Sequence, residues 1–205
     1  MKKVLSVILT VMMIVCMIPV TVLPVSAEGE TEVTYVDRYW DADAKKVVEE
    51  TKTAPATAIT SSSTTLAGGW YYVDGTVTIN YTINVNGTSD NPTCIILKDG
   101  CKLTASKGFV IQDGQAFSIY GQKAGTGVLE ATGADYFAGI SAPDCGSAFI
   151  TINGGTVIAT GGLLSAGIGG GWGGFGFNIT INGGTVTANG EENAAGIGGG
   201  QHGSG

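Results

Sequence analysis

Short apolar stretches separated by glycines dominate the chain from Gly68 onward, and within each stretch apolar and polar positions alternate. Ile150 and Ile152, for example, alternate with Thr151 and Asn153. A period of two is typical of strands that bury one face. The glycines between the stretches permit turns with positive φ. The pattern therefore predicts many short strands joined at glycine-containing corners.

These stretches recur at a fixed interval. Residues 150–157 return letter for letter as residues 179–186, an offset of 29, and residues 166–171 return as residues 195–200 at the same offset. A weaker copy, residues 129–133, lies 28 positions before its counterpart. Two separate blocks that keep one spacing indicate a repeat architecture, in which each unit stacks on its neighbours.

Each repeat unit contains three apolar stretches, and the same triplet extends back to Trp70 with looser sequence. The earlier triplets are residues 70–73, 76–80 and 82–85; residues 95–97, 102–105 and 109–112; and residues 117–120, 128–131 and 137–140. Three strands per turn predict an all-β fold, a right-handed parallel β-helix, with four complete turns and most of a fifth before Gly205.

The offset also predicts the register of the stack. Ile150 is expected directly beside Ile179, and Val157 beside Val186, in parallel strands. Ile152 is expected to point into the core. Asn153 occupies the same position as Asn182 in the repeat, which predicts a hydrogen-bonded ladder at a corner.

The N-terminal segment, residues 1–27, is typical of a secretory signal peptide. Lys2 and Lys3 precede an apolar stretch over residues 4–22, and Val25-Ser26-Ala27 supplies the small residues that cleavage requires. A membrane anchor is the alternative, because about 20 apolar residues can span a bilayer. Cleavage is favoured, and it predicts a protein that is not inserted in the membrane.

Residues 28–66 differ in composition from the repeats. Residues 33–36 and 46–49 flank a short polar segment, which predicts a β-hairpin; a helix over residues 43–52 is the alternative. Residues 54–65 are a linker or an edge segment, and the region is expected to cover the first turn. The expected division is a signal peptide (1–27), a cap or linker (28–66) and a β-helix (67–205). Because residues 198–205 stop inside a repeat, we expect a fragment of a longer protein; a frayed last turn is the alternative.

The charge pattern narrows the class of partner. Removing the leader removes two of the ten basic residues and leaves 17 acidic ones, a net charge of −9. No lysine or arginine follows Lys123. Nucleic-acid binding depends on cations that displace phosphate counterions, so we expect no nucleic-acid partner.

The cysteines that remain after cleavage are Cys94, Cys101 and Cys145. An odd number does not form a disulfide framework. Cys94 and Cys101 are expected to be small buried residues, with a disulfide between them as the alternative. With one histidine in the whole chain, a zinc site is not expected, nor is any other metal or cofactor.

Polysaccharide lyases and hydrolases also use β-helices, so catalysis is the main alternative function. Glu191-Glu192 is the only adjacent acidic pair of the repeats, and it falls in an expected corner loop. Glu130, Asp135 and Asp144 have no spacing that requires them to meet, as paired-carboxylate hydrolysis would need. Residues 170–175 match the glycines of a calcium roll but carry phenylalanine in place of aspartate. No catalytic residue is predicted.

Aromatic residues provide the best candidates for a binding site. Trp172 and Phe175 lie in a glycine-rich stretch that contains few other apolar residues, and Tyr136 lies in the preceding corner. An exposed ring can stack on the apolar face of a sugar. The alternative is that these rings fold over the core as a lid.

The chain resembles the glycine-rich β-helix surface proteins of gut-dwelling Gram-positive anaerobes, often described only as carbohydrate-binding-domain-containing. The resemblance rests on residues 69–73, 96–105 and 118–122 and on the two repeated blocks, and covers residues 33–205. It implies a non-catalytic secreted or cell-wall-associated module, adhesive or glycan-binding, whose partner is extracellular polysaccharide or a host glycan. A polysaccharide-degrading enzyme and a structural spacer are the alternatives.

Overall fold

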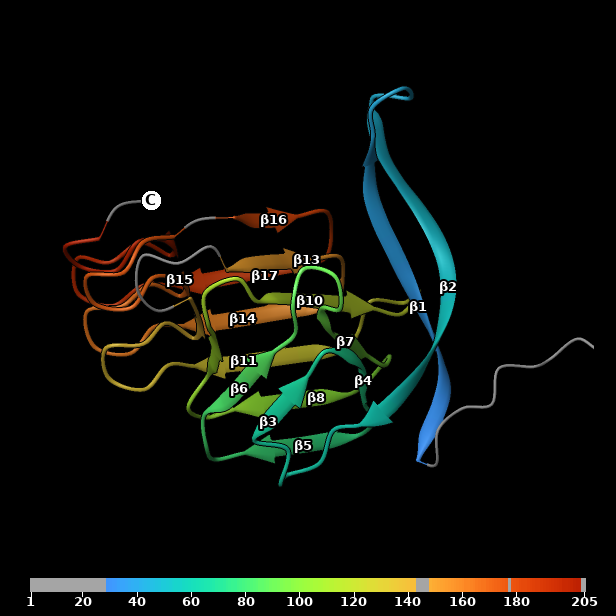
Figure 1. Cartoon of the computed structure of the whole chain (residues 1–205), viewed down its shortest axis with the longest axis horizontal. Helices are drawn as coiled ribbons and strands as arrows, with labels where there is room; N and C mark the ends of the chain where they lie inside the picture. Colours follow the sequence, from blue (N-terminus) through green and yellow to red (C-terminus); the bar gives the residue numbers. More distant parts are fainter. Residues whose placement is uncertain (1–28, 143–147, 177, 204–205) are drawn as a thin grey trace, which may run out of the picture.

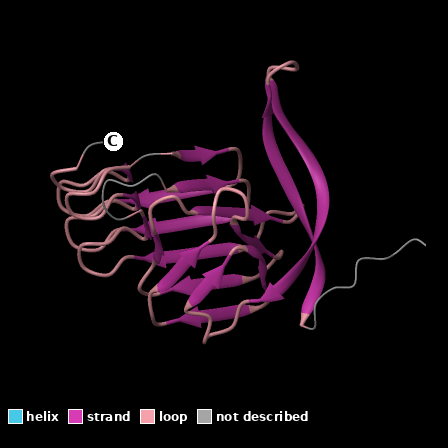
Figure 2. Ribbon diagram, in the orientation of Figure 1, coloured by secondary structure: helices cyan, strands magenta, loops and turns pink. Residues whose placement is uncertain are grey.

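The computed structural model describes residues 29–142, 148–176 and 178–203, which form strands and loops and contain no helix (Figure 2). Within these ranges, therefore, no helix is long and apolar enough to cross a membrane. Three parallel sheets form a solenoid of five stacked turns (Figure 1). This confirms the predicted parallel β-helix.

Each turn contributes one strand to each sheet. The first sheet contains β4 (Gly69–Val73), β7 (Thr93–Leu97), β10 (Ala116–Gly121), β13 (Phe149–Ile152) and β16 (Ile179–Ile181). The second contains β5 (Thr76–Ile79), β8 (Lys102–Ala105), β11 (Val128–Thr132), β14 (Thr156–Thr160) and β17 (Thr185–Asn189). The third contains β6 (Ile83–Asn86), β9 (Phe109–Ile111), β12 (Ile140–Ser141), β15 (Ile168–Gly169) and β18 (Ile197–Gly198).

The predicted register is confirmed. Ile150 pairs with Ile179, and Val157 pairs with Val186, in parallel strands. The fifth turn contributes a strand to all three sheets, more than the sequence predicted. Residues 137–139 belong to a corner loop, so β12 begins only at Ile140.

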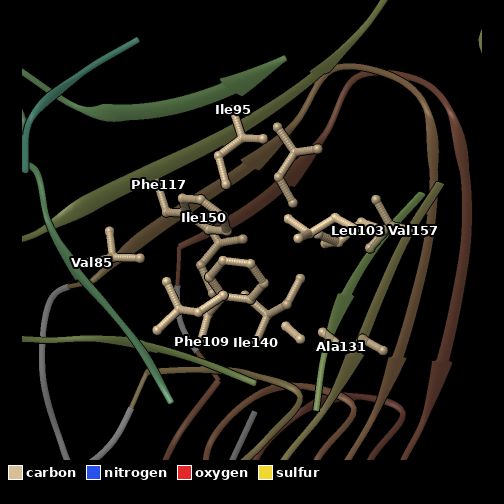
Figure 3. Close-up of a cluster of buried hydrophobic side chains, with 14 of the residues drawn as sticks. Val85, Ile95, Leu103, Phe109, Phe117, Ala131, Ile140, Ile150 and Val157 are labelled. Carbon is tan, nitrogen blue, oxygen red and sulfur yellow. The ribbon is translucent and has the colours of Figure 1, made fainter. Parts of the chain in front are cut away.

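Alternating apolar side chains from all three sheets meet inside the solenoid. Ile95 and Leu103, for example, converge on the same interior (Figure 3). Two rings, Phe109 and Phe117, stack with their centroids 5.0 Å apart. Ile152 is fully buried, as predicted from its inward position.

The N-terminal region forms the predicted hairpin, and the alternative of a helix over residues 43–52 is wrong. Strands β1 (Glu30–Asp41) and β2 (Lys46–Ala58) pair antiparallel along their length. At the tip, the Asp41 carboxylate accepts hydrogen bonds from the backbone N–H groups of Asp43 and Ala44, both at 2.9 Å. These bonds fix the turn locally.

The cap predicted for the first turn is formed by the end of this region. Thr57 and Ala58 of β2 pair in parallel with β4, and the short strand β3 (Thr65–Ala67) pairs with β6. Ile59 and Leu66 are buried in the core. The hairpin itself lies along the outer side of the first sheet, and its tip extends beyond β16 (Figure 1).

A second apolar cluster holds the hairpin to the outer face of the first sheet. The ring of Tyr35 lies 4.5 Å from that of Trp70 and 4.9 Å from that of Tyr120, measured between centroids. Val33 and Ile96 are buried in the same cluster. Aromatic pairs at these separations stabilise a contact beyond the area they bury.

Arg38, the one arginine of the chain, fastens the hairpin to later turns. Its Nε donates to Glu49 at 2.6 Å, and its Nη1 donates to the carbonyl oxygen of Asn153 at 2.6 Å. A Cβ at Gly154 would lie 2.9 Å from the backbone nitrogen of Gly121 as well as 2.8 Å from this guanidinium, so the close backbone approach favours glycine there. The predicted asparagine ladder is confirmed, because Asn182 Nδ2 donates to Asn153 Oδ1 at 2.8 Å.

Cys94 and Cys101 are buried and free, so the alternative of a disulfide between them is wrong. Cys145 lies outside the described residues. Burial raises the pKa of the Cys94 thiol to about 12 and raises the pKa of the Tyr120 hydroxyl above its usual value.

We expect the buried Cys94 thiol and the partly buried Tyr120 hydroxyl to make the protein less stable at high pH. In the unfolded state, the thiol ionises at about pH 8.5 and the hydroxyl at about pH 10. Folded, they keep their protons, so the unfolded state binds fewer protons and stability falls as pH rises above about 8.5. Urea midpoints at pH 7 and pH 10.5 measure the effect, and Cys94→Ala should reduce it. A midpoint that is the same at both pH values would contradict the expectation.

Candidate ligand-binding site

Long corner loops between the second and third sheets carry the candidate site. Residues 133–139, 161–167 and 190–196 form these loops in turns three, four and five, and they project from the left edge of the stack in Figure 1. Tyr136 N–H donates to the Leu163 carbonyl at 3.1 Å, which ties one loop to the next.

The three loops share a backbone conformation. Tyr136, Leu164 and Asn193 occupy equivalent positions and have φ values of 70°, 62° and 61°. L-residues adopt this left-handed region only where the surroundings hold them there. The stacked loops therefore place the side chains of these three residues in a row along the solenoid.

A glycine-rich turn after β15 brings Trp172 beside this row. The N–H of Gly174 donates to the carbonyl of Gly171 at 2.9 Å, and Trp172 N–H donates to the Tyr136 carbonyl at 3.1 Å. A Cβ at Gly171 would collide with that same carbonyl oxygen. The glycines of residues 170–175, which resemble those of a calcium roll, thus permit the backbone of this turn to approach the loop of Tyr136 closely.

Together these residues line an open hollow. The rings of Tyr136 and Trp172 meet edge to face with centroids 6.1 Å apart, and Leu164 completes a hollow of about 300 Å³. Trp172 is 57% exposed and Tyr136 is 50% exposed. These two rings therefore do not fold over the core, and the lid interpretation is wrong for them.

The third candidate from the sequence lies apart from this hollow. Phe175 is half-buried and is not one of the residues that line it. Leu164 was missed, although it occupies the same position of the repeat as Tyr136, and that equivalence could have identified it. Phe137 and Leu163, 38% and 39% exposed, are the sequence neighbours of Tyr136 and Leu164 in the same two loops.

Among the described residues that line the hollow, none has a charged side chain. Of the carboxylates considered for catalysis, Glu130 pairs with Lys102 at 2.7 Å on the second sheet, and Asp135 lies in a corner loop. Glu191 and Glu192 are exposed in the loop of the fifth turn, and Asp144 lies outside the described residues. Within the part of the chain that the structure describes, no group of three or more His, Cys, Asp or Glu could hold a metal ion.

Comparison with known families supports the architecture. The family described as "Beta helix repeat" matches residues 150–172 and 179–201, which fall in the fourth and fifth turns. The fold and these repeats define a β-helix protein. Searches of curated proteins and of solved structures found no match to the chain.

Proposed function

We propose that this β-helix is a non-catalytic extracellular module that binds glycans at the hollow between Tyr136 and Trp172. The observation that carries the proposal is the pair of half-exposed rings, with centroids 6.1 Å apart, around a hollow whose described lining residues carry no charge. Exposed rings present flat apolar surface, and contiguous exposed apolar surface marks interaction sites. The C–H faces of a sugar ring suit such a surface.

The chemistry of the lining favours binding over catalysis. Glycoside hydrolysis needs an acid and a base or nucleophile on either side of the scissile bond. The hollow is lined by Trp172, Leu164 and Tyr136, and none of these side chains supplies a carboxylate. The signal peptide expected at the N-terminus and the resemblance to surface proteins favour an extracellular polysaccharide or a host glycan as the ligand.

We expect Trp172→Ala to abolish glycan binding while leaving the β-sheet circular-dichroism spectrum unchanged, since the exposed ring contributes little to the core. A glycan array with the chain from Glu28 onward identifies ligands, and calorimetry then measures the affinity of each variant. Phe149→Ala is the matched control, because Phe149 is also exposed but lies in β13, away from the corner. Binding that survives Trp172→Ala would move the site elsewhere.

The same binding should be insensitive to salt and to chelators. Screening weakens interactions between charges and does little to a contact made of apolar surface and neutral hydrogen bonds. Loss of binding in EDTA would instead indicate a metal site. Release of reducing ends from the bound polysaccharide would show the alternative, a polysaccharide-degrading enzyme.

A further inference from the structure

The corner that forms the hollow is repeated one turn further along with different side chains. Gln201 N–H donates to the Leu164 carbonyl at 2.9 Å, just as Trp172 N–H donates to the Tyr136 carbonyl at 3.1 Å. Trp172 and Gln201 are also separated in the sequence by the offset of the repeat. The backbone therefore places Gln201 relative to Leu164 as it places Trp172 relative to Tyr136.

The turns that carry the two residues match as well. Gly203 N–H donates to the Gly200 carbonyl at 2.9 Å, the same separation as between Gly174 and Gly171. His202 has a φ of 66°, and its counterpart, a glycine, has a φ of 71°. Equal conformations direct equivalent side chains the same way.

The second copy of the corner is polar where the first is apolar. Leu164 belongs to both copies: it closes the first, and in the second it takes the place that Tyr136 has in the first. In the second copy, Asn193 occupies the position that Leu164 has in the first, and Gln201 occupies the position of Trp172. A carboxamide offers both N–H donors and a carbonyl acceptor, which suits the hydroxyl groups of a sugar.

Resting on the proposed glycan-binding function, we infer that the ligand is a neutral oligosaccharide of at least two units that runs along the solenoid axis. One unit stacks on Trp172 and Tyr136, and the next meets the carboxamides of Asn193 and Gln201. Successive turns lie about 4.8 Å apart, a step comparable to that between neighbouring rings of an extended glycan.

The charges around the second position select against acidic sugars. Glu191 and Glu192 are exposed in the same loop as Asn193. No lysine or arginine follows Lys123 in the sequence, and the carboxylates of Glu191 and Glu192 would repel the carboxylate of a uronate or sialate. A neutral glycan avoids this cost.

The test compares chain lengths of one neutral glycan that binds on the array. In calorimetry with its monomer, dimer and trimer, affinity should rise at least tenfold from monomer to dimer. Gln201→Ala should lower the affinity for the dimer by about threefold to tenfold, the usual effect of losing a neutral hydrogen bond, and leave the monomer unaffected. Thr187→Ala, an exposed change on the second sheet of the same turn, is the matched control.

Different outcomes overturn the two proposals. Binding that depends on Trp172 but is equally tight for monomer and dimer, or is weakened equally for both by Gln201→Ala, overturns the two-position inference alone. Tighter binding of a uronate-containing oligomer than of its neutral counterpart overturns the charge preference. Absence of any Trp172-dependent saccharide binding overturns the proposed function together with this inference.

Discussion

Replacing Ile152 with alanine is expected to lower the free energy of unfolding by about 2–5 kcal/mol. The side chain is fully buried in β13, where it is paired with Ile119 of the turn before and Ile181 of the turn after. Truncation removes apolar contacts and leaves a cavity, because the strands on both sides hold the turns at fixed spacing. A urea titration followed by circular dichroism measures the loss.

Thr151→Ala is the matched control for this prediction. Thr151 is the preceding residue of the same strand and points to the outer face, where it is partly exposed. Its replacement should change stability by about 0.5 kcal/mol or less. Equal losses at the two positions would contradict the assignment of inner and outer faces.

Arg38→Ala is expected to lower stability by about 1–3 kcal/mol, the effect of removing a hydrogen bond from a charged donor. The change leaves the Asn153 carbonyl, which is partly buried, without this partner. The hairpin would lose its hydrogen bond to the fourth turn, so its amide hydrogens near Arg38 should exchange faster with solvent. Hydrogen exchange and a urea titration together measure both effects.

Lys102→Ala serves as the control for the loss of a cation. Lys102 pairs with Glu130 at 2.7 Å, but the two side chains are 45% and 36% exposed. Exposed pairs of this kind contribute about 1 kcal/mol at most. If the arginine and lysine variants lose the same stability and exchange at the same rates, Arg38 does not fasten the hairpin.

The solenoid could be predicted because its information is repeated along the chain. Ile150 and Ile179 pair since identical turns bury the same faces, and the constant offset specifies that pairing without knowledge of any other contact. The ends of strands were predicted less well. The apolar residues 137–140 were predicted to form a strand, yet Phe137 lies in a corner loop that forms hydrogen bonds with the next turn.

The candidate site was predicted in part. Tyr136 and Trp172 were identified because isolated aromatic residues stand out among glycines. Their contact depends on the close approach of two backbones at Gly171, which no sequence pattern specifies. Phe175 was placed with them on composition alone. The polar second position at Gln201 becomes visible only when the hydrogen bonds of the two corners are compared.

The position of the hairpin could not be predicted, because its contacts with the solenoid are not repeated from turn to turn. Its strands were recognisable from alternation around a polar turn. Nothing in the sequence links Arg38 to the distant Asn153, or Val36 to Gly121. The hairpin was therefore expected over the first turn alone, whereas it also contacts Ile96, Tyr120 and Asn153 of the later turns.

This long-range attachment has a consequence for the order of folding. In a simple stack, turns can be added or lost one at a time at the ends, since each contacts only its neighbours. Here the hairpin is synthesised before any turn of the solenoid, but Arg38 can donate to the Asn153 carbonyl only after the fourth turn has formed. Joining Arg38 to Asn153 closes a long loop of chain, which carries an entropic cost. Once closed, this contact links the N-terminal segment to the fourth turn, so that loss of the fourth turn also removes the hydrogen bond of Arg38.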